Sequence, residues 1–179
     1  MEDELGEAVY NDVSTIASTL EKFAHKPNLK EDSVWTRLDI INKCFSKKTV
    51  EDILSSLETE ALSCKDKWMV NAINSIKYAS PTSLKIFLKS IRGGRSSTVE
   101  ECLRHDYTIV RHMLLNNDFF EGSRAMFFDK DKRPKWKPPR LEEVSEDFVK
   151  KFFTDVDNDE DWNNLGLQDR NRKMKISKL

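Results

Sequence analysis

Apolar residues recur along most of the chain at the spacing of one face of an α-helix. In the first such segment they are Val13, Ile16, Ala17, Leu20, Phe23 and Ala24. Residues three, four and seven apart lie on one side of a helix with 3.6 residues per turn. Lys26-Pro27-Asn28 ends this segment, because proline cannot continue a helix. A shorter stripe follows, made of Trp35, Leu38, Ile41 and Phe45.

Hydroxyl residues stand where further helices are expected to begin. They are Thr49, Ser80, Ser97 and Ser145. A hydroxyl at this position accepts an N–H group of the first helical turn. Thr49 and Ser97 are followed three residues on by Asp52 and Glu100, which is the capping-box pattern. Pro81, directly after Ser80, suits a first turn because the N–H that it lacks would have no partner there.

The apolar faces and the ends of these helices can also be placed. The faces comprise Val50, Ile53, Leu54 and Leu57, then Met69, Ala72, Ile73 and Ile76, then Leu84, Phe87, Leu88 and Ile91, then Cys102, Leu103, Tyr107, Val110, Met113 and Leu114. The second of these helices must stop near Ala79, because Pro81 disfavours helical geometry at Ser80. Gly93-Gly94 should end the third in the left-handed conformation that glycine tolerates. A short helix is expected over residues 119–127, and a last one carries Phe148, Phe152 and Phe153.

No segment alternates apolar and polar residues long enough to be a strand. We therefore predict an all-α chain of seven or eight short helices in residues 1–154, followed by a flexible tail, residues 155–179. The tail begins with an acidic run, Asp155 to Asp161, and ends in basic residues. The run lacks the glycine and the glutamate of a calcium-binding loop, so a solvated linker is the favoured interpretation.

The composition and net charge of the chain exclude some classes of partner. The formal net charge is −1, with 34% charged and 38% hydrophobic residues. A general nucleic-acid binder or a protein of anionic membrane surfaces needs a basic surface, so neither partner is expected. No apolar run approaches the roughly 20 residues of a membrane-spanning helix. The first seven residues are acidic, the wrong charge for a mitochondrial presequence.

The three cysteines, Cys44, Cys64 and Cys102, have neither close pairing nor metal-type spacing. Reduced thiols in an intracellular compartment are therefore expected. His105 and His112 are seven residues apart on one helix, too far for a shared metal ion. We predict no metal site and assign neither histidine a role.

Three ordered motifs carry a resemblance to a known family. They are Ile41-Asn42-Lys43-Cys44-Phe45-Ser46, then Ser80-Pro81-Thr82-Ser83-Leu84-Lys85, then the stretch from Asn117 to Met126 with its continuation from Asp129 to Pro138. In this order and at this spacing they resemble the C-terminal region of the 3-hydroxyisobutyryl-CoA hydrolases. These enzymes are a branch of the crotonase (enoyl-CoA hydratase/isomerase) superfamily. The resemblance covers roughly residues 35–155.

The resemblance implies an activity and a place for its chemistry. The family hydrolyses 3-hydroxyisobutyryl-CoA, a thioester of valine breakdown, without a cofactor; coenzyme A is part of the substrate. Two backbone N–H groups hold the thioester oxygen as it becomes an oxyanion, and a glutamate and an aspartate complete the site. Those positions precede the matched region, and residues 1–34 do not resemble them. We therefore name no catalytic residue and expect no hydrolysis by this chain alone.

The resemblance also gives candidate binding residues. In crotonase-like enzymes the segment matching residues 117–127 and the cation after it border the entrance for coenzyme A. Lys130, with Lys132 and Lys135, would suit its phosphates by charge. Phe119, Phe120, Met126 and Phe127 can be core residues, with Trp136 packed behind proline-stiffened turns. No catalytic role is expected for Ser80, Thr82 or Ser83.

The chain ends in Ser177-Lys178-Leu179, the tripeptide read by the peroxisomal import receptor. A peroxisomal location is therefore predicted, with the mitochondrion or the cytoplasm as alternatives.

Three hypotheses follow. The chain is the C-terminal part of a hydrolase of this family; or it is a non-catalytic interaction module that binds a full-length relative; or it is a catalytically silent structural subunit. In the last two cases homo- or hetero-oligomers with full-length relatives are expected.

Overall fold

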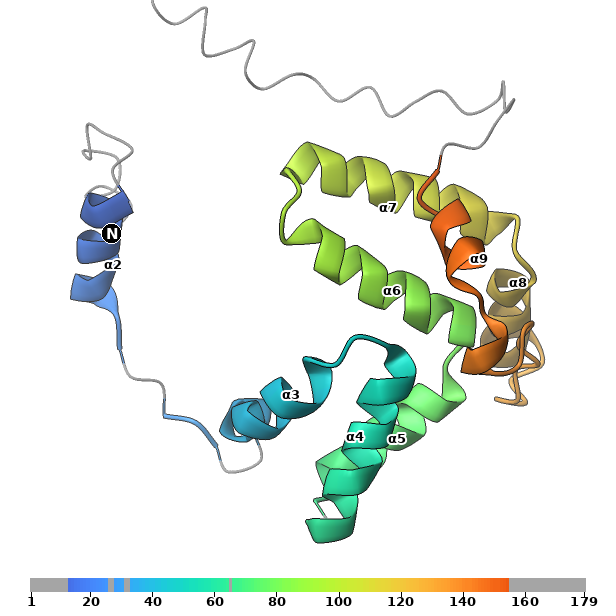
Figure 1. The fold of residues 1–179 in the computed structure, drawn as a ribbon, viewed down its shortest axis with the longest axis horizontal. Coiled ribbons are helices and arrows are strands. Elements are labelled where there is room, and N and C mark those ends of the chain that lie inside the picture. Colours follow the sequence, from blue (N-terminus) through green and yellow to red (C-terminus); the bar gives the residue numbers. More distant parts are fainter. Residues whose placement is uncertain (1–12, 26–27, 31–32, 65, 155–179) are drawn as a thin grey trace, which may run out of the picture. The chain divides into compact units, whose positions relative to one another are not determined.

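The computed structural model describes residues 13–25, 28–30, 33–64 and 66–154. Within these residues every regular element is helical, and eight of them are α-helices (Figure 1). The predicted fold class and number of helices are thereby confirmed for the described part of the chain. The predicted tail, residues 155–179, lies outside the described residues, and the division into domains stays a prediction.

The chain divides into two compact units, residues 1–41 and 42–179. The described part of the first unit holds α2 (Val13–Phe23), the 3-10 turn η1 (Val34–Arg37) and the start of α3 (Leu38–Phe45). Ser33 caps η1, where its hydroxyl accepts the backbone N–H of Trp35 at 3.4 Å.

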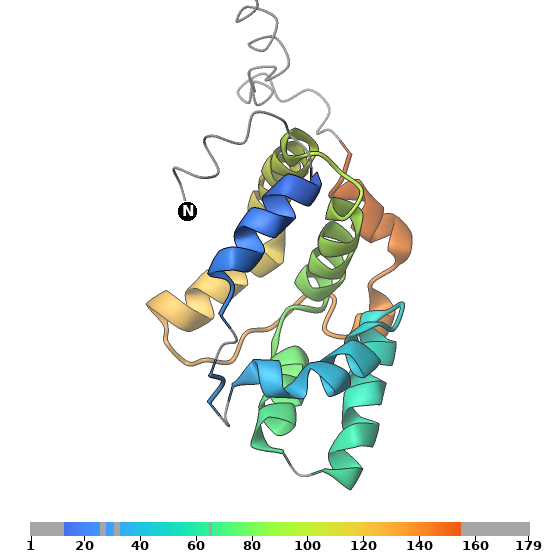
Figure 2. The same ribbon diagram turned by 90° about the vertical axis from the view of Figure 1, so that its left-hand side faces the viewer.

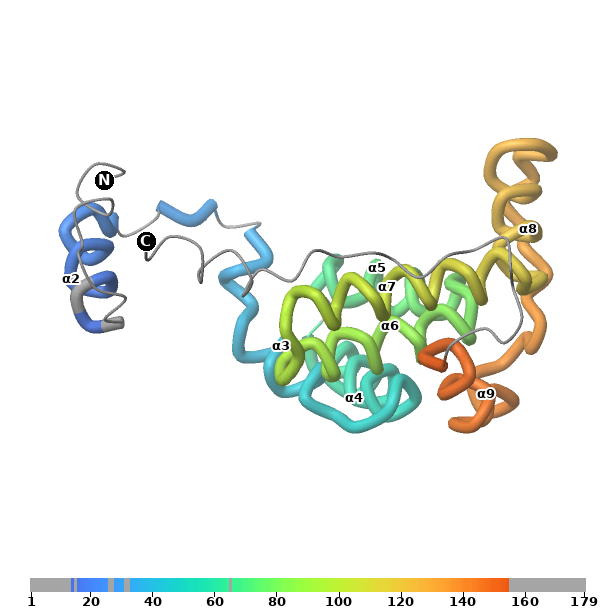
Figure 3. The backbone as a smooth tube through the Cα atoms, turned by 90° about the horizontal axis from the view of Figure 1, so that it is seen from above, coloured from blue at the N-terminus to red at the C-terminus, as the bar shows by residue number. Residues whose placement is uncertain are grey.

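The second unit holds the remaining elements and all of the motifs from Ser80 onward. In chain order they are α4 (Val50–Ser63), α5 (Lys67–Tyr78), α6 (Pro81–Gly94), α7 (Val99–Leu114), α8 (Asn117–Ser123), the π-helical turn η2 (Arg124–Phe128), the 3-10 turn η3 (Leu141–Glu143) and α9 (Glu146–Lys151). Helix α4 packs against α5, and α6 contacts α4, α7, η3 and α9. Helix α8 and η2 continue beyond the end of α7 and project away from α6 (Figure 3).

Side-chain caps fix three helix starts where the sequence places them. The hydroxyls of Thr49, Ser80 and Ser145 accept the backbone N–H of Asp52, Ser83 and Phe148, each at 3.1 Å. The capping box of α7 lies one residue later than predicted. Its hydroxyl belongs to Thr98 and its carboxylate to Glu101, whose Oε2 accepts the N–H of Thr98 at 2.7 Å.

The predicted left-handed ending at Gly93-Gly94 is wrong. None of the described glycines has a positive φ, and α6 runs through Gly94 to a right-handed residue, Arg95. The chain turns instead through backbone bonds from Ser96 to the Gly93 carbonyl (3.2 Å) and from Ser97 to the Gly94 carbonyl (3.3 Å). These bonds satisfy carbonyls of the last helical turn, so no left-handed residue is needed.

The second unit buries apolar side chains of several elements. Cys44 of α3, Val50, Ile53 and Leu57 of α4 and Met69 of α5 are buried, and α4 packs against α5. A core cluster holds Ile86, Val144, Val149 and Phe152, with Ile109, Met113, Phe148 and Phe153 packed against it. Helices α6, α7 and α9 surround this cluster and lie side by side in Figure 2.

Candidate functional site

The segment from Asn117 to Pro138 is anchored to the start of α6 by one buried carboxylate. Asp118 is only 3% exposed. Its Oδ2 accepts the hydroxyl proton of Ser80 at 2.6 Å, and its Oδ1 accepts the backbone N–H of Lys137 at 2.9 Å. Ser80 is also the N-cap of α6. The carboxylate thus joins α8, the start of α6 and the loop that follows η2.

Arg124 organises the same loop from the other side. Its Nε and Nη2 donate to the two carboxylate oxygens of Glu121 at 2.9 and 2.8 Å. Its Nη1 donates to Asp129 at 2.5 Å and to Asp131 at 2.8 Å. Oε1 of Glu121 also accepts the backbone N–H of Lys135 at 2.7 Å. One guanidinium therefore pairs with three carboxylates and fixes the path of the charged turn.

These contacts shift the pKa values of the carboxyl groups. The Arg124 guanidinium and then the Lys135 N–H hold the pKa of Glu121 at about 2, below its ordinary value of 4.5. The same guanidinium, with the N–H of Arg133, lowers the pKa of Asp131. Its carboxylate partners, Glu121 first, raise the pKa of Arg124. All three groups therefore remain charged at neutral pH.

We expect acid to release this loop. Because the pKa of Glu121 is lower in the folded state, its stabilising contribution is complete above pH 4.5 and is lost as the pH falls toward about 2. The backbone amide signal of Lys135, followed by NMR through this range, should move toward its unbonded position. In a Glu121→Gln variant this acid step should be absent; an identical transition in both proteins would contradict the assignment.

Trp136 packs against Gly122 of α8. Its indole N–H donates to the backbone carbonyl of Tyr78 at 2.8 Å, and the Tyr78 hydroxyl donates to the carbonyl of Lys132 at 3.0 Å. A Cβ atom added at Gly122 would lie 3.2 Å from the ring, closer than ordinary van der Waals contact. Glycine at this position of α8 thus makes room for the tryptophan.

The predicted core role of four apolar residues near this loop is wrong. Phe119, Phe120, Met126 and Phe127 are exposed, and Phe127 keeps 75% of its surface accessible. The reason is that α8 and η2 project from the end of α7, so only Ala125 on η2 is buried. With Phe128, these four form what we call the α8–η2 apolar surface. Exposed groups of large apolar side chains are typical of interaction sites.

The three lysines predicted to bind coenzyme A lie on the loop that Arg124 organises. Lys130, Lys132 and Lys135 are all exposed. Lys130 and Lys132 have left-handed backbone conformations, with φ of 55° and 54°. The backbone of Lys132 is held by its N–H, which donates to the Ala125 carbonyl at 3.1 Å. The structure thus brings the three onto one hydrogen-bonded turn, and their binding role stays a prediction.

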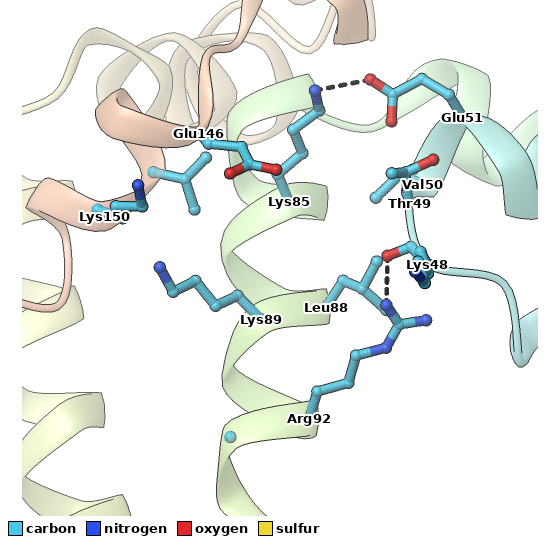
Figure 4. A pocket seen from close by; sticks show the side chains of 12 residues that line it. Lys48, Thr49, Val50, Glu51, Lys85, Leu88, Lys89, Arg92, Glu146 and Lys150 are labelled. Carbon is cyan, nitrogen blue, oxygen red and sulfur yellow. Dashed lines mark hydrogen bonds and ion pairs between the residues drawn. The ribbon is translucent and has the colours of Figure 1, made fainter.

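A pocket of about 540 Å³ lies elsewhere in the second unit, between the start of α4, one side of α6 and α9 (Figure 4). Five cationic side chains line it: Lys48, Lys85, Lys89, Arg92 and Lys150. Its carboxylates are Glu51 and Glu146, and its apolar wall is made of Val50, Leu88 and Val149. We call it the α4–α6–α9 pocket.

Some of these cations are held by the protein itself. Lys85 Nζ lies 2.6 Å from Glu51 Oε1 and donates to the Val144 carbonyl at 3.0 Å. The Arg92 guanidinium donates to the backbone carbonyls of Lys47 and Lys48. Lys150 pairs with Asp147 at 2.9 Å, which raises the pKa of this lysine.

The sequence analysis missed this pocket. Its lining comes from three segments that are far apart in the sequence, and packing brings them together. One signal was available. Lys85, Lys89 and Arg92 are spaced i, i+4 and i+7, so they share a face of α6 beside the apolar stripe.

The remaining chemistry-bearing residues have structural contacts. His112 Nε2 lies 2.8 Å from the Thr154 carbonyl oxygen, and its ring packs against Phe152. His105 stacks edge-on against Phe153. Cys102, on the predicted apolar face of α7, is half-buried, while Cys44 is buried. The described residues contain no group of three or more histidine, cysteine or acidic side chains that could hold a metal ion.

Two further predictions concern the C-terminal tripeptide and membrane-spanning helices. Ser177, Lys178 and Leu179, like the rest of the predicted tail, lie outside the described residues. No helix in the described part of the chain combines the length and the apolar character needed to cross a membrane.

Comparison with known proteins gives consistent matches. A model of the enoyl-CoA hydratase/isomerase family matches residues 1–153. An Arabidopsis thaliana protein named probable 3-hydroxyisobutyryl-CoA hydrolase 3 is 41% identical over 174 residues, which are 96% of this chain and 46% of that protein. Another from the same plant, 3-hydroxyisobutyryl-CoA hydrolase-like protein 1, mitochondrial, is 43% identical over 86% of this chain and 39% of its own length.

Among solved structures, a carnitinyl-CoA dehydratase from Mycobacterium thermoresistibile superimposes with a TM-score of 0.64 at 29% identity. The match covers 87% of this chain and 43% of the dehydratase. The chain therefore spans less than half the length of the relatives that it matches.

Proposed function

Because this chain belongs to the enoyl-CoA hydratase/isomerase family, we propose that it is the helical C-terminal part of an acyl-CoA thioester hydrolase. Its substrate would be 3-hydroxyisobutyryl-CoA, an intermediate of valine breakdown. One observation carries the proposal: 96% of the chain aligns at 41% identity with a relative named for this activity. The resemblance seen in the motifs is confirmed at the family level. The family match also begins at residue 1, well before the first motif at Ile41.

The proposal assigns this chain a supporting role in the reaction. Thioester hydrolysis needs donors for the oxyanion and groups that transfer protons. We place these on the part of the enzyme that the chain does not match, since it spans only 46% of the hydrolase relative. The described residues form helices that would complete the enzyme around that part.

The α8–η2 apolar surface supports this role. Phe120, Phe127 and Phe128 each keep more than 60% of their surface accessible. Covering such side chains is favourable by about 25 cal/mol for each Å² of apolar surface removed from water. We propose that the catalytic part of the enzyme packs on this surface. Lys130, Lys132 and Lys135, on the adjoining turn, would then face the phosphates of coenzyme A.

The test joins the two parts. The chain is purified alone and also together with the unmatched part of the Arabidopsis hydrolase, and release of coenzyme A thiol from 3-hydroxyisobutyryl-CoA is measured. We expect no turnover above background from the chain alone and turnover from the two parts together. Hydrolysis by the isolated chain would overturn the proposal.

A pair of variants locates the contact. Phe127→Asp places a charge on the α8–η2 apolar surface and should reduce complex formation, measured by light scattering. Leu62→Asp places the same charge on α4, where the leucine is 85% exposed, and should leave the complex intact. Equal behaviour of the two variants would place the contact elsewhere.

The alternative is a non-catalytic module that binds a full-length relative or forms a structural subunit with it. The same exposed surface suits that role. It predicts a stable complex with the intact hydrolase, with the thiol release of that enzyme altered or unchanged. The first proposal predicts no such complex, because the intact enzyme already covers the corresponding surface.

Two observations bear on the cellular location, and they favour different compartments. The relative named as mitochondrial fits the stated alternative of a mitochondrial location. Recognition of Ser177-Lys178-Leu179 by the peroxisomal import receptor stays a prediction.

A further inference from the structure

We propose that the α4–α6–α9 pocket binds an organic phosphate of nucleotide size. The inference rests on the pocket itself and does not depend on the proposed hydrolase function. None of the lysines assigned above to coenzyme A, Lys130, Lys132 and Lys135, lines this pocket. It is therefore a second candidate site on the same chain.

Charge is the first reason. Five cationic side chains from three segments of the second unit face one cavity, against two carboxylates. Like charges gathered around one cavity repel each other, and a bound anion removes this cost. The N-terminal end of α4, at Thr49 and Val50, also lies in the wall and adds its partial positive charge.

The second reason is that part of this charge is fixed and part is available. Arg92 is held by the carbonyls of Lys47 and Lys48, and Lys85 by Glu51 and Val144, so both cations are already positioned. Among the described residues no carboxylate pairs with the ammonium of Lys48 or with that of Lys89. Lys89 Nζ lies 5.0 Å above the Phe153 ring, which leaves its N–H groups for a ligand. Two ammonium groups beside fixed cations suit a phosphate with several charged oxygens.

The volume of the pocket and its apolar residues indicate what the ligand carries besides its phosphate. A volume of about 540 Å³ is within the usual range for small organic ligands, roughly 300–1,000 Å³. Val50, Leu88 and Val149 give one side of the pocket an apolar surface. Oε2 of Glu51 is buried without a hydrogen-bond partner in the described part of the chain, so a hydroxyl donor on the ligand would satisfy it. A phosphate ester with a hydroxyl-bearing sugar and a flat apolar group meets all three features.

Calorimetric titration of the full 179-residue chain tests this inference. Pyrophosphate, ATP and free coenzyme A are compared at low salt. We expect ATP, coenzyme A or both to bind more tightly than pyrophosphate, which lacks an apolar group and a hydroxyl. Binding of coenzyme A alone would identify the nucleotide of a thioester as the source of the phosphate; similar binding of ATP would identify free nucleotides. Absence of binding by all three at millimolar concentration would overturn the proposal.

Three variants connect the binding to the pocket. Lys89→Gln and Lys48→Gln should each weaken binding about tenfold, the loss expected for one charge-assisted hydrogen bond. Glu146→Gln, which removes a carboxylate from the wall, should strengthen binding several-fold. Lys151→Gln removes the same charge from α9 outside the pocket and should change binding less than about twofold. Equal losses in Lys89→Gln and Lys151→Gln would overturn the site, whether or not the chain takes part in thioester hydrolysis.

Discussion

Leu57→Ala should lower the free energy of unfolding by about 2–5 kcal/mol. Leu57 has no accessible surface and lies on α4, which packs against α5. Met69 of α5 is equally inaccessible. Truncating the leucine removes buried carbon atoms and leaves a cavity that the two helices cannot fully close. The loss is a large fraction of the stability of a small domain.

Urea unfolding followed by far-ultraviolet circular dichroism measures the effect. Leu62→Ala is the matched control, because Leu62 lies on the same helix and is 85% exposed. The control should stay within about 0.5 kcal/mol of the unsubstituted chain. A similar loss in both variants would show that helix propensity, and not burial, determines the result.

Asp118→Ala should cost about 2–4 kcal/mol, the second largest effect expected. The substitution leaves the Ser80 hydroxyl and the Lys137 N–H without their acceptor, and both bonds are to a buried, charged group. The loop before Pro138 should detach from α6 at the same time. The indole of Trp136, held next to Lys137 by the Tyr78 carbonyl, should therefore become more accessible to fluorescence quenchers.

A double-mutant cycle tests whether the Ser80–Asp118 bond is responsible. Because the two side chains share one hydrogen bond, the losses of Ser80→Ala and Asp118→Ala should not add in the double variant. Asp106→Ala, an exposed aspartate on α7, should change stability by less than about 0.5 kcal/mol. Fully additive losses for Ser80 and Asp118 would contradict the anchoring role of this bond.

The helices were predictable because their signals are local. Apolar spacing placed α4 to α7, and hydroxyl caps at Thr49, Ser80 and Ser145 placed three helix starts to the residue. The predicted left-handed end of α6 at Gly93-Gly94 was wrong because glycine permits this conformation without requiring it. Backbone hydrogen bonds donated by Ser96 and Ser97 end the helix instead. At the start of α7 the neighbouring hydroxyls of Ser97 and Thr98 can both serve as the N-cap, and in the structure Thr98 is the N-cap.

The candidate sites were predictable only in part. The motif from Asn117 to Pro138 could be recognised in the sequence. The contacts between its side chains could not be predicted. The Arg124 guanidinium pairs with three carboxylates only because the turn folds so that they surround it. The exposure of Phe119 and Phe127 likewise depends on where α8 projects. Helical spacing identifies an apolar face, but it does not say whether anything covers that face.

The sequence by itself determined the helical class, three of the helix starts and the family, since each depends on residues within a few turns of one another or on ordered motifs. The tertiary structure alone decided which apolar faces are buried and which cations meet. Lys48, Lys89 and Lys150 face one pocket because α4, α6 and α9 pack together. Contacts between distant segments depend on the summed packing of the whole unit, which no local pattern encodes.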